Sequence, residues 1–324
     1  MKILLKVAGW LILILFIVVS AAAAYVTIVL PNVDPAPDLK VEATPERIAH
    51  GEYLANHVVV CMDCHSQRDF SKFSGPLAPG TLGQGGERFS EEFGFPGVFY
   101  SKNITPANLA DWTDGEIYRA ITTGVTKDNK ALFPVMPYKH YAMMDPEDVK
   151  DVIAYLRSLP PIENEVPESK PNFPFNFILN TIPENAKPIK KPSPTNKVEY
   201  GRYLAYIAGC AECHTPSDSK GNKIPGMEFA GGWEMGLGNN HFVTTANLTP
   251  HQETGLGTWT ESDFINRFKM YADSGYVVPT VGPDEFQTIM PWVMYSQMKT
   301  DDLAAIFAYL QTLPPVENAV VKYR

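Results

Sequence analysis

Two five-residue segments combine residue types that could do chemistry, CMDCH at 61–65 and CAECH at 210–214. Both have the spacing C-x-x-C-H, in which two cysteines bond covalently to the vinyl groups of a haem and the adjoining histidine ligates the iron. The two segments account for all four cysteines of the chain. The sequence therefore predicts two covalently attached haem c groups, held by Cys61, Cys64, His65, Cys210, Cys213 and His214.

Other sites also use a C-x-x-C pair, among them thioredoxin-like redox sites and zinc sites. A thioredoxin-like pair needs no histidine directly after it. A zinc site of four thiolates would leave both histidines without a role. A disulfide framework is typical of short secreted chains, whereas this chain has 324 residues. The repeated histidine therefore favours haem over these alternatives.

The second axial ligand of each iron decides between electron transfer and chemistry, because methionine raises the reduction potential and an open position admits peroxide. Met136 and Met290 are the predicted second ligands. Each follows its cysteines in the same order and precedes a proline, which resists helix formation and favours an extended loop. Several nearby side chains remain alternative ligands: His57, His140, Met143, Met144, Met294 and Met298.

Two asparagines and two tryptophans recur at matching places in the two halves: Asn103 and Asn247, Trp112 and Trp259. We expect the asparagines beside the haem, where the side chain bonds a propionate or caps a following helix. The tryptophans either donate the indole N–H to a propionate or pack in the core. The sequence leaves both interpretations open.

Five short segments recur in the same order in the two halves, so the chain is a tandem repeat. The pairs are GEYLA at 51–55 and GRYLA at 201–205, NITP at 103–106 and NLTP at 247–250, WT at 112–113 and 259–260, MP at 136–137 and 290–291, and AYLRSLPP at 154–161 and AYLQTLPP at 308–315. We predict two domains, 46–161 and 197–324, joined by a proline-rich linker at 162–196. The apolar run 173–179 of this linker is expected to pack between the domains, with a docking surface as the alternative.

The fold class follows from the pattern of apolar residues. Residues 145–158 and 300–312 have apolar side chains at helical spacing, and a double proline follows each segment. Further helices are expected at 45–60, 113–123, 197–209 and 260–271. Glycine-rich loops fill 75–97 and 221–238, and no strand pattern is strong. The sequence therefore predicts an all-α fold with long loops.

The N-terminus carries an apolar run at 7–30, long enough to cross a bilayer as one helix. Lys2 and Lys6 precede this run and Asp34 follows it, so the positive-inside rule leaves the body outside the cytoplasm. A cleaved signal peptide ending at 21–24 is the alternative. Because apolar residues continue to Leu30, we favour a retained anchor at 1–31, followed by a linker at 32–45.

The net charge is −9, and the chain has no cluster of Lys and Arg of the kind that nucleic-acid binding needs. An acidic carrier instead suggests a protein partner with a basic docking patch.

Together these motifs resemble class I c-type cytochrome domains. More narrowly, they resemble the cytochrome subunits of membrane-bound periplasmic alcohol, aldehyde and gluconate dehydrogenases. The resemblance implies two tandem class I domains in which the four cysteines attach haem, the two histidines are proximal ligands, and Met136 and Met290 are distal ligands. Those subunits carry three haem motifs and a C-terminal membrane segment. This chain has two motifs and its apolar run is N-terminal.

The expected function is one-electron transfer in a respiratory or dehydrogenase-linked chain, without enzymatic turnover. The carrier would be single-pass in the inner membrane with its body in the periplasm. Its partners would be a periplasmic dehydrogenase, a quinol-oxidising complex or a terminal oxidase. A dihaem enzyme such as a peroxidase is the alternative function, and a dedicated subunit of one complex is an alternative form of the carrier.

Overall fold

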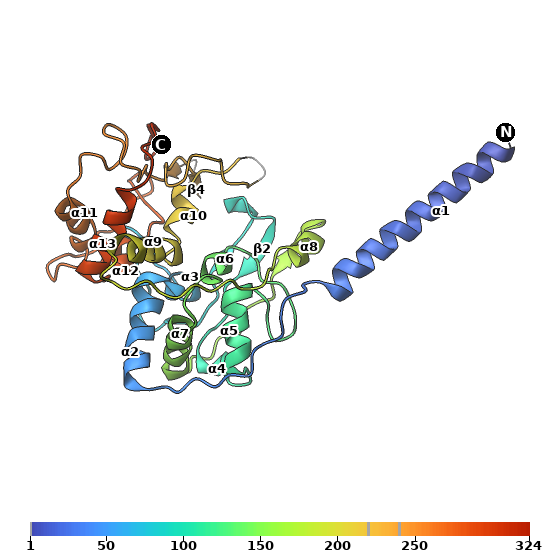
Figure 1. Cartoon of the computed structure of the whole chain (residues 1–324), viewed down its shortest axis with the longest axis horizontal. Coiled ribbons are helices and arrows are strands. Elements are labelled where there is room, and N and C mark those ends of the chain that lie inside the picture. The colour runs from blue at the N-terminus through green and yellow to red at the C-terminus, as the bar shows by residue number, and fades with distance from the viewer. Residues whose placement is uncertain (1, 219–220, 239–240) are drawn as a thin grey trace.

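The computed structural model describes residues 2–218, 221–238 and 241–324. A long N-terminal helix, α1 (Lys2–Ala24), projects from a body that contains both haem motifs (Figure 1). It continues as a π-helical turn, η1 (Tyr25–Val29). In the described part of the chain, α1 together with η1 is the one helix long and apolar enough to cross a membrane, and its most apolar stretch is not buried against the body.

The body is mostly helical, as the sequence predicts. The first repeat contains α2 (Pro45–Tyr53), η2 (Leu54–Val58), α3 (Cys61–His65), α4 (Pro106–Leu109), α5 (Asp114–Thr123), α6 (Tyr138–Tyr141) and α7 (Pro146–Ser158). The second contains α9 (Lys197–Ile207), α10 (Cys210–His214), α11 (Glu261–Lys269), α12 (Trp292–Tyr295) and α13 (Thr300–Leu310). Thr113 and Thr260 each form a capping box at the start of α5 and α11, which fixes where these helices begin.

In each repeat the closing helix packs on the helix that enters the haem motif, α7 on α2 and α13 on α9. A glycine makes this close approach possible. A Cβ atom on Gly51 would lie 1.8 Å from the carbonyl oxygen of Asp151, and one on Gly201 would lie 1.8 Å from that of Ala305. The recurring Gly-x-Tyr-Leu segment therefore places a helix–helix contact beside each haem motif.

The entry helices differ by one residue. One residue more separates Tyr53 from Cys61 than separates Tyr203 from Cys210. The first repeat accommodates the extra residue in the π-helical turn η2, while α9 has regular α-helical structure from Lys197 to Ile207.

The sheets are small, and two of the five strands in the described residues lie within the glycine-rich loops. An antiparallel sheet has the order β1 (Arg88–Phe89), β2 (Gly97–Tyr100), β3 (Lys170–Pro171), with Phe89 opposite Phe99 and Val98 opposite Lys170. A second antiparallel pair joins β4 (Glu234–Gly238) to β5 (His241–Thr244). These short strands lack the alternating pattern that would have predicted them.

The two repeats share one continuous apolar core and pack face to face. Equivalent side chains of the two repeats form reciprocal hydrogen bonds across this contact. The Tyr203 hydroxyl donates to Asp148 at 2.6 Å, and the Tyr53 hydroxyl donates to Asp302 at 2.5 Å. Because these are matching positions of the two repeats, the contact has approximate twofold symmetry.

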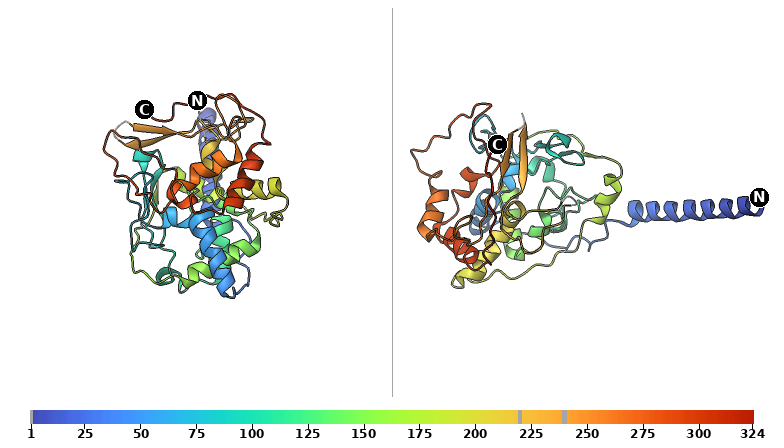
Figure 2. Two further views of the ribbon diagram at one scale, coloured as in Figure 1. Left: turned by 90° about the vertical axis from the view of Figure 1, so that its left-hand side faces the viewer. Right: turned by 90° about the horizontal axis from the view of Figure 1, so that it is seen from above.

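The expectation that residues 173–179 pack between the domains is wrong. This part of the linker forms α8 (Phe175–Ile178) and η4 (Leu179–Thr181). Phe175 lies against Phe99 and Phe133 of the first repeat, with ring centroids 6.4 and 5.7 Å away. The segment lies near the point where α1 leaves the body (Figure 2). It packs there because the stacked rings of Phe99 and Phe133 form an apolar surface.

Candidate haem sites

Each C-x-x-C-H motif forms a single helical turn, α3 or α10, so that the two cysteines lie on one face. None of the four cysteines is in a disulfide. Burial raises the pKa of the Cys61, Cys210 and Cys213 thiols to about 12. A reactive thiolate needs the opposite shift. The surroundings are therefore unlike those of a thioredoxin-like site and suit a buried thioether.

The two motif histidines are held in the same way. The Nδ1 atom of His65 donates to the carbonyl oxygen of Lys102 at 2.6 Å, and that of His214 to Ala246 at 2.7 Å. Because a carbonyl only accepts, each Nδ1 carries the hydrogen and Nε2 keeps its lone pair for a metal. Burial lowers the pKa of both imidazoles, which favours this neutral form.

A glycine lets the loop that supplies each carbonyl approach the histidine. Gly85 N–H donates to the His65 carbonyl at 2.8 Å, and Gly231 N–H donates to the His214 carbonyl at 2.7 Å. Both glycines have positive φ, and a Cβ atom on Gly85 would lie 2.5 Å from the Lys102 backbone. On Gly231 it would lie 2.4 Å from the Ala246 backbone. Any other residue would push the loop away from the imidazole.

The recurring asparagines brace the same loop. Asn103 accepts from the backbone N–H and hydroxyl of Thr105 and donates to the carbonyl of Ile162, just beyond α7. Asn247 has the same bonds to Thr249 and to the carbonyl of Val316. These bonds tie the loop that orients the histidine to the end of the closing helix. The contact with a propionate stays a prediction.

The two Met-Pro segments have one conformation. Tyr138 N–H donates to the Met136 carbonyl and Trp292 N–H to the Met290 carbonyl, both at 2.8 Å. The prolines between have φ of −80° and ψ of 50° and 63°, which makes each a three-residue turn. Proline suits this position because its φ is fixed and its missing N–H is not needed.

Tyr141 and Tyr295 complete each Met-Pro segment, and our sequence reasoning missed both. Their buried hydroxyls donate to the carbonyls of Val59 at 2.9 Å and Ala208 at 2.7 Å, just before the haem cysteines. Each tyrosine therefore ties the methionine segment to the attachment motif of its own repeat. A tyrosine at the same place after Met-Pro in both repeats was the available signal.

A small apolar cavity lies between the first haem cysteine and the predicted methionine ligand of the first repeat. Its lining includes Cys61, Met136 and Met144 together with Val59, Ile121, Tyr141, Val149 and Val152. A thiol and a thioether around apolar space, together with the open Nε2 of His65, fit haem c. Met144 faces the same cavity and remains the alternative to Met136.

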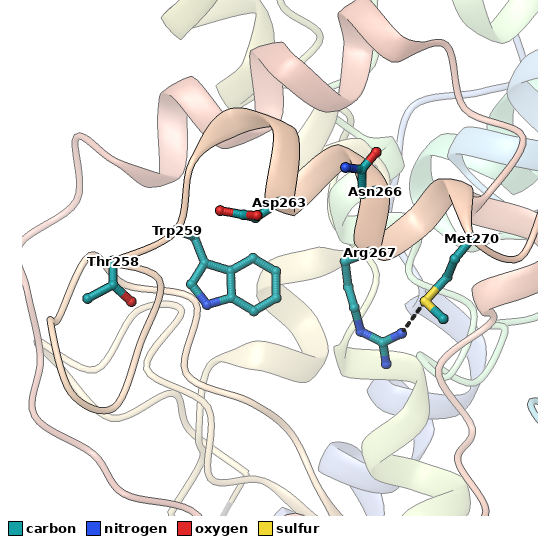
Figure 3. Close-up of a pocket in the computed structure, with 6 residues that line it drawn as sticks. All are labelled: Thr258, Trp259, Asp263, Asn266, Arg267 and Met270. Atoms are coloured by element: carbon teal, nitrogen blue, oxygen red, sulfur yellow. Dashed lines mark hydrogen bonds between the residues drawn. The ribbon is translucent and has the colours of Figure 1, made fainter.

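The second repeat has an open hollow beside α11 (Figure 3). Its lining residues are Thr258, Trp259, Asp263, Asn266, Arg267 and Met270. The Arg267 guanidinium lies 4.2 Å from the ring centroid of Trp292, the second residue after Met290. Trp259 is half-buried at the edge of the core, as is Trp112 in the first repeat. The prediction that these indoles reach a propionate remains untested.

Comparison with known proteins decides the family. Residues 198–314 match the sequence profile of the Cytochrome c family. A diheme cytochrome c-type of Cereibacter sphaeroides is 30% identical over 269 residues, which cover 79% of this chain and 83% of that protein. The chain belongs to the cytochrome c family. It therefore binds haem c covalently and works in electron transfer rather than as a catalyst.

Other relatives of this cytochrome are longer. The gluconate 2-dehydrogenase cytochrome c subunit of Pantoea cypripedii is 26% identical over 84% of this chain and 60% of that protein. The fructose dehydrogenase cytochrome subunit of Gluconobacter japonicus is 28% identical over 91% of this chain and 59% of that protein. The cytochrome thus spans about 60% of the length of these two subunits.

Both histidines among the alternative ligands have other partners. His57 lies near the Met294 carbonyl of the second repeat at 3.2 Å, and His140 contacts Glu212 at 3.0 Å. Met298 is buried in the core. Both histidines therefore belong to the contact between the repeats of this cytochrome.

The Met290 segment is also held from the other repeat. Ser74 is buried, and its hydroxyl donates to the Met290 carbonyl at 2.6 Å and accepts from Trp292 N–H at 3.0 Å. Arg68 pairs with Asp63 of the first haem motif at 3.1 Å and reaches the Ile289 carbonyl at 3.4 Å. The loop after the first haem motif therefore positions the predicted distal ligand of the second.

Proposed function

We propose that this cytochrome is a dihaem one-electron carrier with one haem in each repeat. Cys61, Cys64 and His65 would hold the first haem, and Met136 would supply its second iron ligand. Cys210, Cys213 and His214 would hold the second haem, and Met290 would supply its second iron ligand. The observation that carries the proposal is the duplicated histidine geometry, in which a backbone carbonyl takes Nδ1–H and leaves Nε2 free in both repeats. The domains are 46–161 and 197–324, with 162–196 as linker.

Haem c supplies reversible one-electron chemistry at its iron when bound. The residues of this chain fix the imidazoles, keep water from the apolar cavity beside Cys61, and hold the methionine segments through Tyr141 and Tyr295. Asn103 and Asn247 support the histidine loops, and Trp112 and Trp259 shield the edges of the two sites. A peroxidase is less well supported, because both repeats offer methionine at the same place and neither is specialised.

We further propose that α1 and η1 are retained as a single span of the inner membrane, with the body in the periplasm. Length and composition of residues 2–29 support a span. The chain's similarity to gluconate and fructose dehydrogenase cytochrome subunits supports a membrane-bound dehydrogenase as electron donor. A quinol-oxidising complex or terminal oxidase then serves as the second partner. The membrane tether would raise the effective concentration near such complexes.

Mass spectrometry and optical spectroscopy of the purified mature protein test the haem assignment. We expect two added haem masses, and low-spin oxidised haems with a thioether-to-iron charge-transfer band. Met136→Ala and Met290→Ala should each remove part of that band, and the double variant should remove all of it. Met144→Ala is the matched control and should leave it. Fewer than two haems, or a band that survives the double variant, would overturn the proposal.

The carrier and the peroxidase differ in their reaction with small ligands. The carrier predicts no turnover of peroxide and slow cyanide binding in the oxidised protein. A high-spin haem that binds cyanide readily would instead support the enzyme. Co-purification from detergent-solubilised membranes separates a dedicated dehydrogenase subunit, which brings a stoichiometric flavin or quinone enzyme with it, from a free-standing carrier.

A further inference from the structure

The linker segment 173–178 exposes large apolar side chains. Phe173 is 82% exposed and Ile178 is 47% exposed. The Phe177 ring packs edge-on against Phe173 at 6.2 Å, so the two aromatic rings form one apolar protrusion. A protrusion of this kind is unfavourable in water and favourable where it finds an apolar medium.

This protrusion is mounted rigidly on the first repeat. Phe175, between the exposed residues, packs its ring against Phe99 and Phe133. Just before the segment, β3 pairs with β2, and Asn172 N–H donates to the Pro96 carbonyl at 3.0 Å. Just after it, Leu179 is buried. The segment is therefore held to the first repeat on both sides of the exposed Phe173 ring.

The depth of the protrusion is set by a contact with the membrane helix. The Asn180 side chain donates to the Val26 carbonyl at 3.2 Å, and η4 contacts η1. The 28 residues of α1 and η1 extend about 42 Å at roughly 1.5 Å a residue, which exceeds a hydrocarbon core of about 30 Å. The last turn, η1, therefore lies at the end of the span that faces the body, where the acyl chains meet the headgroups. Phe173 and Phe177 lie near that level.

We propose that residues 173–178 insert into the phospholipid interface around the exit of α1. Phenylalanine and isoleucine side chains gain from this region of a bilayer, because the acyl chains just below the headgroups remove their apolar surface from water. The proposal rests on the retained anchor of the proposed function. The partner is the lipid surface itself, and continuity with the membrane helix is the reason to prefer it to a protein.

Insertion at this second point would fix the orientation of the body. A single helix alone would let the body rotate about its short connection at residues 30–32. With α8 also seated, the end of the body that carries α1 and α8 faces the membrane, and the end that carries α11 and α13 faces away from it (Figure 1).

Photo-crosslinking of the full chain in phospholipid nanodiscs tests the proposal. Benzoylphenylalanine replaces Phe173, which keeps an aromatic ring at the site. The matched control places the same group at Val277, which is 83% exposed in the segment between α11 and α12. We expect phospholipid adducts at position 173 and none above background at 277. A label at 173 that gives no lipid adduct or captures a co-purified protein instead, or equal lipid labelling at the two sites, would overturn the insertion.

A second measurement keeps the test independent of the anchor and the haems. Haem content and the intact N-terminal mass are determined on the same sample. A sample with both intact and no lipid adduct at 173 refutes the insertion alone, whereas loss of the N-terminal helix refutes the anchor on which it rests. Phe177→Glu should reduce the lipid adduct at 173 by breaking the apolar pair, and Lys187→Glu, an exposed site in the same linker, should leave it unchanged.

Discussion

At the residue scale, the haem sites depend on backbone groups as much as on the motif itself. His65 and His214 are oriented by carbonyls of a distant loop, and Gly85 and Gly231 let those carbonyls come close. The outer hydrogen bond fixes the tautomer and leaves Nε2 free to ligate the iron. The methionine side differs between repeats, because the Met290 segment also bonds to Ser74 of the other repeat.

Replacing Ser74 by alanine should affect the second haem alone. The change removes the two hydrogen bonds of Ser74 and leaves the Met290 carbonyl and the Trp292 N–H with only their bond to each other. This loss costs about 0.5–1.5 kcal/mol for each bond and loosens the Met290 segment. We expect a weaker charge-transfer band and a lower reduction potential for one haem, measured by spectroelectrochemical titration. Ser71→Ala, an exposed serine three residues away, is the control. Equal shifts of both potentials would contradict the assignment of Ser74 to the Met290 segment.

At the scale of single elements, the π-helical turn η2 records an extra residue that the second repeat lacks. Asn56 lies in this turn, and its Oδ1 atom is buried without a hydrogen-bond partner in the described structure. The extra residue is tolerated because one wide turn accommodates it. Tyr53 therefore keeps its bond to Asp302, and Cys61 keeps its place at the start of α3.

Deleting Asn56 should be tolerated, since it gives the first repeat the spacing that α9 already uses. We expect haem attachment to persist and the unfolding free energy to fall by no more than about 1–2 kcal/mol, for the lost bond to Tyr155. Deleting Ala205 from α9 should instead rotate Tyr203 away from Asp148 and abolish folding. Denaturant unfolding followed by circular dichroism distinguishes the two. An equal loss of unfolding free energy from both deletions would show that the fold requires the extra residue in η2.

The contact between α2 and α7 gives a prediction for how the stability of the fold changes at acidic pH. Arg47 and then Lys150 bond the Glu147 carboxylate and lower its pKa from 4.5 to about 2. A carboxylate with a depressed pKa stabilises the fold above 4.5, and this contribution is lost as the pH falls toward 2. Glu147→Gln should therefore lower Tm at neutral pH and flatten the fall in Tm between these two pH values. Glu184→Gln, an exposed linker carboxylate, is the control, and a matching flattening there would refute the role of Glu147.

At the scale of the whole molecule, the two repeats act as one folding unit because their buried residues form one apolar cluster. Two reciprocal tyrosine–carboxylate bonds cross the contact. Hydrogen bonds to a charged acceptor in a buried contact are among the stronger ones in proteins. The contact therefore fixes the relative placement of the two haem motifs.

Tyr53→Phe and Tyr203→Phe should each lower the unfolding free energy by about 1–3 kcal/mol, because a buried carboxylate loses a donor. Both variants should still unfold in one calorimetric transition, and the double variant should broaden or split it. Tyr100→Phe, whose hydroxyl bonds to no described residue, is the control and should leave Tm unchanged. Two separate transitions in the unmodified protein would contradict a shared core.

The sequence by itself determined the covalent chemistry and the longer helices. Cysteine spacing within one helical turn, apolar periodicity in 145–158 and 300–312, and the order of five repeated segments are local patterns, and local patterns are written directly in the chain. Only the tertiary structure decided which carbonyls orient the histidines, that Tyr141 and Tyr295 secure the methionine segments, and that Ser74 serves the opposite repeat. It also moved residues 173–179 from the expected domain contact to the exit of α1. These contacts join segments far apart in the chain, and packing of the whole core, rather than spacing, sets which of them meet.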